Sequence, residues 1–247
     1  KSHELSSKVR GAMIYPSVIF VVMIGIVFFV VLYIFPKILE MFEGTDAVLP
    51  LPTRILIYVT HFMQNYWYAV IIAIVALIYL YLQAMKHPDF KKRVHQLRLK
   101  LPIAGKIIKK INLASFTMTL CSLLNSTIPI IEAVRISADV LGNVIYKQSL
   151  NEASESLKKG VNLSAVLSRT PEIYPPMVTE MIMVGEETGN IEKMLNELSE
   201  YYNSEVSETM NNFTSIIEPV IILVLGIGVA GVAVAVIMPM YSLSQSI

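Results

Sequence analysis

The stretch VIFVVMIGIVFFVV, residues 18–31, decides the fold class of this protein. It lies at the centre of 26 uncharged residues that separate Arg10 from Lys37. At about 1.5 Å of rise per residue, a helix of this length exceeds the roughly 30 Å hydrocarbon core of a bilayer. A secretory signal peptide would have a shorter apolar region followed by a small-residue cleavage site. Residues 11–36 are therefore predicted to form a transmembrane helix.

Two further segments have the length and composition of membrane spans. Residues 67–82 are apolar and carry aromatic side chains at both ends, as the interfacial belts of membrane helices do. They predict a second span at residues 58–85. No charged residue follows Glu218, and residues 219–240 are long enough for a third span. With 54% hydrophobic and only 16% charged residues, the chain is more apolar than an ordinary soluble domain.

Lysine and arginine residues are unevenly distributed around the first two spans. Nine of them lie in residues 86–110, whereas only Lys37 and Arg54 lie between the two spans. Cytoplasmic segments next to membrane spans are enriched in these residues, and this bias sets the orientation of the chain. It predicts a cytoplasmic location for residues 1–10 and 86–218, and an external location for the loop 37–57 and the tail 241–247.

The formal net charge of +1 hides two oppositely charged parts. Residues 1–110 carry a net charge of +9 and residues 111–247 a net charge of −8. This asymmetry argues against nucleic-acid binding by the chain as a whole and indicates a membrane protein with distinct compartments. A single cysteine, Cys121, excludes an internal disulfide framework.

A repeat relates the first and third predicted spans. Pro16 and Pro219 align at an offset of 203 residues, and each is followed 20 residues later by a second proline, Pro36 and Pro239. Chance is an alternative explanation, because prolines are common in the first turn of helices and just past their ends. If the repeat is real, a soluble domain should precede the first span as one precedes the third. Residues 1–10 are then expected to be the remnant of a missing N-terminal cytoplasmic domain.

Residues 111–218 show apolar positions at helical spacing, without the sustained alternation of strands. We expect Pro129 at the first position of a helix that Gly142 ends with a left-handed cap. A later helix should end at Gly189, and Asn190 should cap the long helix that follows. Together with the spans, these patterns predict an all-α membrane protein: three transmembrane helices plus one cytoplasmic six-helix bundle.

The segment 86–110 is predicted to be a basic cytoplasmic linker between the second span and the bundle. Two interpretations of its charge are equally supported. Basic side chains close to a membrane attract anionic lipid headgroups by about 1 kcal/mol each. Alternatively, the cations only set the topology of the neighbouring span.

No motif for enzymatic chemistry is found. The chain has no Gly-x-x-x-x-Gly-Lys-Ser/Thr motif for binding nucleotide phosphates, and its four histidines lack the spacing of metal ligands on a helix. The predicted spans have no ionisable residues in their cores, which weakens a transporter hypothesis. We therefore expect no catalytic residue, metal or cofactor, and no enzymatic activity.

Small residues in the third predicted span form a spaced pattern. Gly226, Gly228 and Gly231 match a dinucleotide-binding fingerprint, but they lie within a membrane span rather than after a strand. Close helix packing is the better interpretation, because small residues four positions apart let two membrane helices approach closely. The predicted packing residues are Gly226, Ala230, Gly231 and Ala235.

Two adjacent acids, Glu186 and Glu187, lie between Gly185 and Gly189. In the last turn of a helix, negative charges oppose the helix dipole at a cost of a few tenths of a kcal/mol each. One interpretation is a solvated helix end. The other is a contact with a basic partner or a cation, which makes this Gly-Glu-Glu-x-Gly segment the candidate partner-interaction site.

Several short motifs, in order along the chain, are similar to those of one known family. From about Lys8 to Met240 the sequence resembles the inner-membrane platform proteins of type II secretion systems and type IV pilus machines, the F family. Residues 125–129 depart from the family, which usually has a Gly-Val/Ile-Pro turn there. The matching motifs are Lys8-x-Arg10-x-Ala12-x-x-Tyr15-Pro16, Leu49-Pro50-x-Pro52-Thr53, Leu101-Pro102-x-x-Gly105, Leu120-x-x-Leu123-Leu124, Lys159-Gly160-x-x-Leu163-Ser164, Pro175-Pro176, Val184-Gly185-Glu186-Glu187-x-Gly189 and Glu218-Pro219.

The resemblance implies a non-enzymatic function. Such a protein is expected to be an oligomeric platform in the inner membrane, between a cytoplasmic assembly ATPase and pilin or pseudopilin subunits. Other inner-membrane assembly proteins are implied as further partners. The alternative is a membrane subunit of an ATPase-coupled small-molecule permease, which the lack of ionisable residues in the cores of the spans disfavours.

Overall fold

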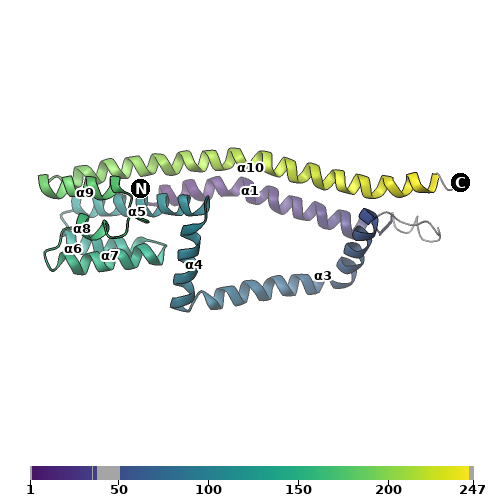
Figure 1. Ribbon diagram of the computed structural model, residues 1–247, viewed down its shortest axis with the longest axis horizontal. Helices are drawn as coiled ribbons and strands as arrows, with labels where there is room; N and C mark the ends of the chain where they lie inside the picture. Colours follow the sequence, from purple (N-terminus) through teal and green to yellow (C-terminus); the bar gives the residue numbers. More distant parts are fainter. Residues whose placement is uncertain (1, 35, 38–50, 245–247) are drawn as a thin grey trace. The chain divides into compact units, whose positions relative to one another are not determined.

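The computed structural model describes residues 2–34, 36–37 and 51–244. These residues form helices and connecting turns, and no β-strand occurs among them (Figure 1). The chain divides into two compact units. One comprises residues 1–11 and 82–212, and the other comprises residues 12–81 and 213–247. The predicted all-α class is confirmed.

The second unit contains long apolar helices. Helix α1 spans Ser2–Phe29, belongs to this unit from Ala12 onward, and continues as a π-helix, η1, over Val30–Ile34. Helix α3 spans Leu51–Ala84, and α10, which spans Ile191–Ser244, contributes its residues from Phe213 onward. Helix α3 therefore begins within the segment 37–57 that the sequence predicts to be a loop. Residues 38–50 lie outside the described residues.

Four described helices are long and apolar enough to cross a membrane. Three of these helices contain the predicted spans. In the most apolar stretch of each, at most 6% of the residues are buried within the protein. The fourth helix is α5 at Ala104–Asn125, and 50% of the residues in its most apolar stretch are buried. Its side chains Leu113, Phe116 and Leu120 are fully buried in the bundle core. This packing accounts for the apolar character of α5, while the division into three spans and a bundle stays a prediction.

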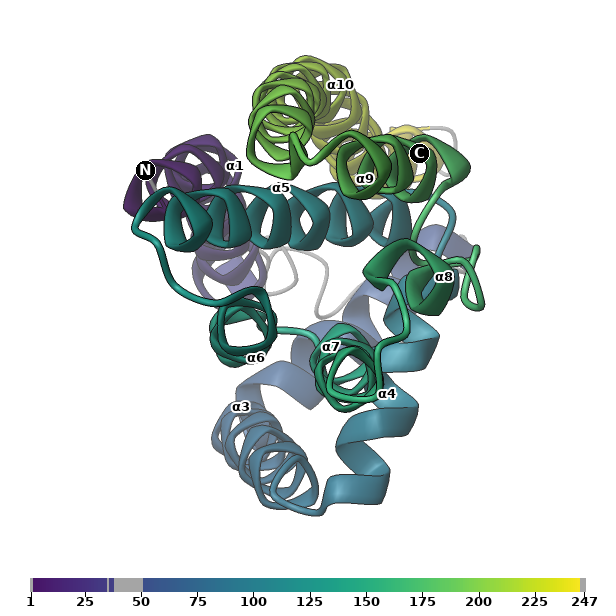
Figure 2. The same ribbon diagram turned by 90° about the vertical axis from the view of Figure 1, so that its left-hand side faces the viewer.

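Helix α5 is the central helix of the first unit. It lies between α6 and α7 on one side and α9 and α10 on the other (Figure 2). Contacts between helices also join α7 to α8, α8 to α9, and α4 to both α5 and α7. The helices of this unit besides α5 are α4 at Pro88–Lys100, α6 at Ile130–Val140, α7 at Val144–Leu157, α8 at Leu163–Leu167, α9 at Pro176–Thr188, and the first part of α10.

Three aromatic side chains form the centre of the core. The Tyr174 ring packs edge-on against Phe116 at 6.0 Å and Tyr146 at 5.5 Å between ring centroids. The Tyr146 hydroxyl donates a hydrogen bond of 2.8 Å to the carbonyl of Ile173. Burial raises the pKa of Tyr146 and of Tyr174 well above that of an exposed tyrosine, so both side chains are neutral.

Polar contacts at two points join α5 to α10. The Lys110 ammonium lies 2.6 Å from the Glu205 carboxylate and donates a hydrogen bond of 2.9 Å to the Thr209 hydroxyl. Farther along α5, the Cys121 thiol lies 3.7 Å from the carbonyl oxygen of Glu192. Since later residues of α5 meet earlier residues of α10, the two helices run in opposite directions.

Most predicted helix ends lie close to those of the structure. Pro129 is the N-cap residue, one position before α6, rather than its first helical residue. Gly142 follows the cap residue Leu141, and the prediction of a left-handed conformation for Gly142 is wrong. Gly189 has that conformation, with φ of 69°, and ends α9 as predicted. Asn190 directly precedes α10, but its side-chain amide donates to the carbonyl of Thr188.

The turn at residues 125–129 contains an unusual conformation. Thr127 has a positive φ of 59°. The other described residues with a positive φ are glycines. A β-branched residue is strained in this region, whereas glycine is not. The resemblance noted in the sequence leads us to expect glycine in this turn, so the departure from that pattern coincides with a strained backbone.

The predicted basic linker is mostly helical. Residues 88–100 form α4, and α5 begins at Ala104. The corner between them depends on Gly105, because a Cβ atom at this position would clash with the carbonyl oxygen of Leu99. Only glycine permits so close an approach of the two backbones.

Candidate functional site: the Glu186 junction

Glu186, in the last turn of α9, connects this helix to the start of α8. Its carboxylate accepts hydrogen bonds from the backbone amides of Leu163 at 2.6 Å and Ser164 at 3.2 Å, and another from the Ser164 hydroxyl. The amides of Leu163 and Ser164 are at the start of α8, where the first N–H groups of a helix have no partners within the helix. Glu186 therefore caps α8 from a position 22 residues later in the chain.

The same contact explains why an acid is tolerated near the end of α9. A negative charge there is opposed by the dipole of α9, which ends at Thr188. Its interaction with the amino-terminal end of α8 is favourable, and hydrogen bonds to a charged acceptor are stronger than neutral ones. The contact with α8 therefore compensates for the unfavourable position of Glu186 in α9.

The two glycines of the junction have separate structural roles. A Cβ atom on Gly185 would lie 2.8 Å from the Cα of Ile191, so this glycine permits close packing of α9 on the start of α10. Gly189 reverses the chain direction through its positive φ. The backbone amide of Asn190 then donates a hydrogen bond of 2.9 Å to the carbonyl of Gly185. Gly185 and Gly189 thus fix the angle at which α10 begins.

Glu187 differs from its neighbour Glu186 in being exposed. The predicted partner-interaction residues therefore divide into two groups. Gly185, Glu186 and Gly189 make contacts or turns within the bundle, whereas Glu187 extends from its surface. The sequence does not distinguish the two acids. Their environments differ because only Glu186 contacts α8, which is distant in the chain.

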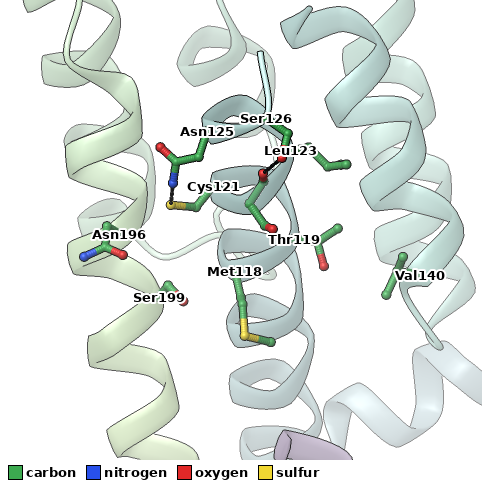
Figure 3. Close-up of a pocket in the computed structure, with 10 residues that line it drawn as sticks. Met118, Thr119, Cys121, Leu123, Asn125, Ser126, Val140, Asn196 and Ser199 are labelled. Carbon is green, nitrogen blue, oxygen red and sulfur yellow. Dashed lines mark hydrogen bonds between the residues drawn. The ribbon is translucent and has the colours of Figure 1, made fainter. Parts of the chain in front are cut away.

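A pocket of about 550 Å³ lies beside α5 (Figure 3). Its wall includes the thiol of Cys121, which accepts a hydrogen bond of 3.4 Å from the Asn125 amide. Asn196 and Ser199 of α10 contribute polar atoms on one side. The complete lining is Met118, Thr119, Cys121, Ser122, Leu123, Asn125, Ser126, Val140, Asn196 and Ser199.

The lining of this pocket contains no Asp, Glu, His, Lys or Arg side chain. Across the described part of the chain, no group of three or more His, Cys, Asp or Glu residues is placed to hold a metal ion. The pocket therefore offers hydrogen-bonding and apolar surface.

The predicted packing residues of the third span lie in the exposed part of α10. A Cβ atom on Gly226 or Gly231 would have no atom of another described segment within 4 Å. Ala230 is exposed, and the side chain of Ala235 lies outside the described residues. Their role in helix packing stays a prediction, and a partner helix would have to come from another molecule or from parts of this chain that are not described.

Comparison with known proteins identifies the family. Residues 116–239 match the family model described as type II secretion system protein F. This range includes the Glu186 junction, the pocket and the boundary between the two units within α10.

Individual relatives match over nearly the whole chain. The type IV pilus assembly protein PilC of Myxococcus xanthus is 32% identical over 100% of this chain and 59% of its own length. The PilC protein of Thermus thermophilus is 32% identical over 98% of this chain and 60% of its own. The type II secretion system protein F of Vibrio cholerae is 32% identical over 98% and 59%.

The chain spans about three fifths of the length of these relatives. The family model covers half of the chain. The apolar helices of this protein are long enough to cross a membrane. This protein is therefore a multi-pass inner-membrane member of the type II secretion system protein F family.

Proposed function

We propose that this protein is a non-enzymatic platform of a type IV pilus or type II secretion machine. In this proposal it couples a cytoplasmic assembly ATPase to the polymerisation of pilin or pseudopilin subunits. The names of the relatives, which refer to pilus assembly and secretion, support the setting. The observation that carries the coupling step is the uninterrupted course of α10.

Helix α10 contributes to both units of the protein. Its 54 residues correspond to about 80 Å at the usual helical rise. The boundary between the units falls between Asn212 and Phe213, within this helix. A helix without a break resists bending and twisting more strongly than a flexible loop does. A force applied to the bundle would therefore be transmitted along α10 to its apolar segment.

Inserting a flexible segment into α10 tests this coupling. A seven-residue Gly-Ser insertion after Thr214 should abolish assembly of surface filaments, or secretion, while membrane insertion and protein level stay normal. The matched control is a seven-residue insertion of alanine, glutamate and lysine at the same site. Seven helical residues turn through about two full turns, so the control adds the same length but keeps the helix continuous and nearly in phase.

We expect the control to retain at least part of the activity, measured as filament number or secreted protein. If the Gly-Ser variant assembled filaments as well as the original protein, transmission along α10 would be refuted. If both variants were inactive, the spacing between the units rather than the continuity of the helix would be essential, and the proposed coupling would also fail.

We further propose that Glu187 contacts a basic surface of the assembly ATPase or of another cytoplasmic component. Its side chain is exposed on a bundle that belongs to the acidic part of the chain. Complementary charge accelerates association and favours one partner over others. Gly185, Glu186 and Gly189 support this contact indirectly by holding the end of α9 in place.

A further inference from the structure

Helix α4 has an exposed apolar stripe. Phe90 is 40% exposed, Leu97 is 65% exposed, and Leu101, at the end of the helix, is 46% exposed. With the half-buried Val94, these residues follow the spacing i, i+4, i+7 and i+11, which places them on one side of a helix. Large apolar side chains aligned on the surface indicate a binding surface rather than scattered exposure.

Basic side chains flank this stripe on both sides. At about 100° per residue, Arg93 and Lys100 lie along one edge of the stripe, and Lys91 and Arg98 lie along the other. Lysine and arginine can extend along apolar surface while their charged ends stay in a polar environment. An apolar stripe between two rows of cations is the pattern of a helix that lies in the interface of an anionic membrane.

The opposite side of α4 is packed on the bundle. His95 is buried, and its Nδ1 atom accepts a hydrogen bond of 3.1 Å from the backbone amide of Val144, the first residue of α7. The close backbone contact at Gly105 fixes the other end of α4 to α5. The exposed stripe is therefore held in a defined orientation by contacts on the far side of the helix.

Covalent connection keeps α4 close to a predicted membrane span. Helix α3 ends at Ala84 and α4 begins at Pro88, so three residues separate the helices. An extended connection of this length reaches about 14 Å at most. The start of α4 must therefore lie near the membrane surface if residues 58–85 cross the bilayer.

We propose that α4 lies in the membrane interface and binds anionic lipid headgroups. The Phe90, Val94, Leu97 and Leu101 side chains insert below the headgroups, and the flanking cations contact lipid phosphates. The bundle is thereby attached to the membrane surface at a second place besides α10. This attachment would resist displacement of the bundle when a partner applies force to it.

Spin-label accessibility in the full chain tests this proposal. In a Cys121→Ala background, a nitroxide is attached to either Leu97→Cys or Gln96→Cys, and the protein is placed in bilayers of phosphatidylcholine with 30% phosphatidylglycerol. We expect the label at position 97 to be accessible to oxygen, which concentrates in lipid, and protected from a water-soluble nickel chelate. The label at position 96, on a polar side of α4, should be accessible to the nickel chelate.

Three results separate the possible environments of the stripe. High oxygen access with low nickel access at position 97 supports lipid insertion. Nickel access equal to that at position 96 would show a water-exposed helix, and protection from both reagents would show a protein covering the stripe. Either of the last two results overturns the proposal.

The role of charge is tested separately by the double variant Arg93→Gln and Lys100→Gln. Removing two cations near an anionic surface should lower the ratio of inserted to exposed label about 25-fold, or about fivefold for each charge. The matched control, Lys158→Gln with Lys159→Gln, removes the same charge from a loop of the bundle. An unchanged ratio in the first variant, or an equal loss in both, would refute headgroup binding by α4.

Discussion

Glu186 and Glu187 are adjacent in sequence, but only Glu186 has a defined contact in the bundle. Its carboxylate accepts two backbone hydrogen bonds and one from the Ser164 hydroxyl. Helix α8 has only five residues, so its own hydrogen bonds provide little stability. The position of α8 therefore depends strongly on a residue outside it.

The variant Glu186→Gln should destabilise α8 locally. The loss of the carboxylate charge weakens hydrogen bonds that are worth about 1.5–3 kcal/mol when the acceptor is charged. We expect faster amide hydrogen exchange at residues 163–167, with little change in the core of α5. Exchange measured by mass spectrometry on the full protein checks this outcome.

Glu187→Gln is the matched control, since it removes the same charge one residue away. It should leave exchange in α8 unchanged but weaken association with the cytoplasmic ATPase. If Glu186→Gln left α8 unchanged, the capping role would be wrong. If Glu187→Gln left association unchanged, the proposed partner contact would be withdrawn and Glu187 would be assigned to a solvated helix end.

Helix α4 is attached to α7 by His95, and the contact requires the neutral form of this histidine. The Nδ1 atom of His95 can accept the hydrogen bond of Val144 only without a proton. Burial, followed by the charges of Arg98 and Lys91, lowers the pKa of His95 below its usual value of 6.5. The folded protein therefore favours the form that makes the contact.

This contact should weaken in acid. Because the unfolded state binds the proton more readily, the stabilising effect of His95 is complete above pH 6.5 and declines as the pH falls from there toward the lowered pKa of the folded state. Protection of the Val144 amide from exchange, corrected for the intrinsic rate, should decrease from pH 7 to pH 5. The variant His95→Ala should be less protected at pH 7 and should lose this pH dependence. A similar pH dependence in that variant would assign the effect to another group.

The prolines of the two aligned segments lie inside helices. Pro16 is in the interior of α1, and Pro219 is in the interior of α10. A preference for the first turn of a helix therefore does not explain their matching positions. Each removes one backbone hydrogen bond from its helix, although α10 continues as a helix through Pro219. The repeat interpretation gains support from this shared and unfavourable placement.

For the whole molecule, the separation of charge predicts the topology. The +9 of residues 1–110 borders the first two predicted spans, whereas all 14 acids of residues 111–247 precede Pro219. Basic residues near the spans favour the cytoplasmic side. The bundle is then predicted to be cytoplasmic and acidic, so a basic partner surface fits it better than an acidic one.

Cysteine labelling in intact cells checks this topology. In a Cys121→Ala background, a membrane-impermeant maleimide should react with Leu243→Cys at the predicted external tail. It should not react with Asn151→Cys, an exposed position of α7, until the membrane is permeabilised. Labelling of Asn151→Cys before permeabilisation would contradict the predicted orientation.

The helical class and the candidate spans could be predicted from the sequence, because helical periodicity and the length of an apolar run are local properties. The end of α9 was also predictable, since Gly189 acts through neighbouring residues, whereas the side chain of Asn190 bonds to the carbonyl of Thr188 rather than capping α10 as expected. The helix α4 was missed because the charges of residues 86–110 dominate its composition and obscure the apolar stripe. That stripe becomes apparent only when the buried face around His95 is known.

The sequence by itself determined what each segment prefers: helices, apolar runs long enough for a bilayer, and a charge distribution that favours one orientation. Only the tertiary structure decided that Glu186 caps α8, that Gly105 and Gly185 permit close backbone contacts, and that α5 is half buried in the bundle. The physical reason is that these features depend on atoms brought together from distant parts of the chain. Local patterns contain no information about which of these atoms will meet.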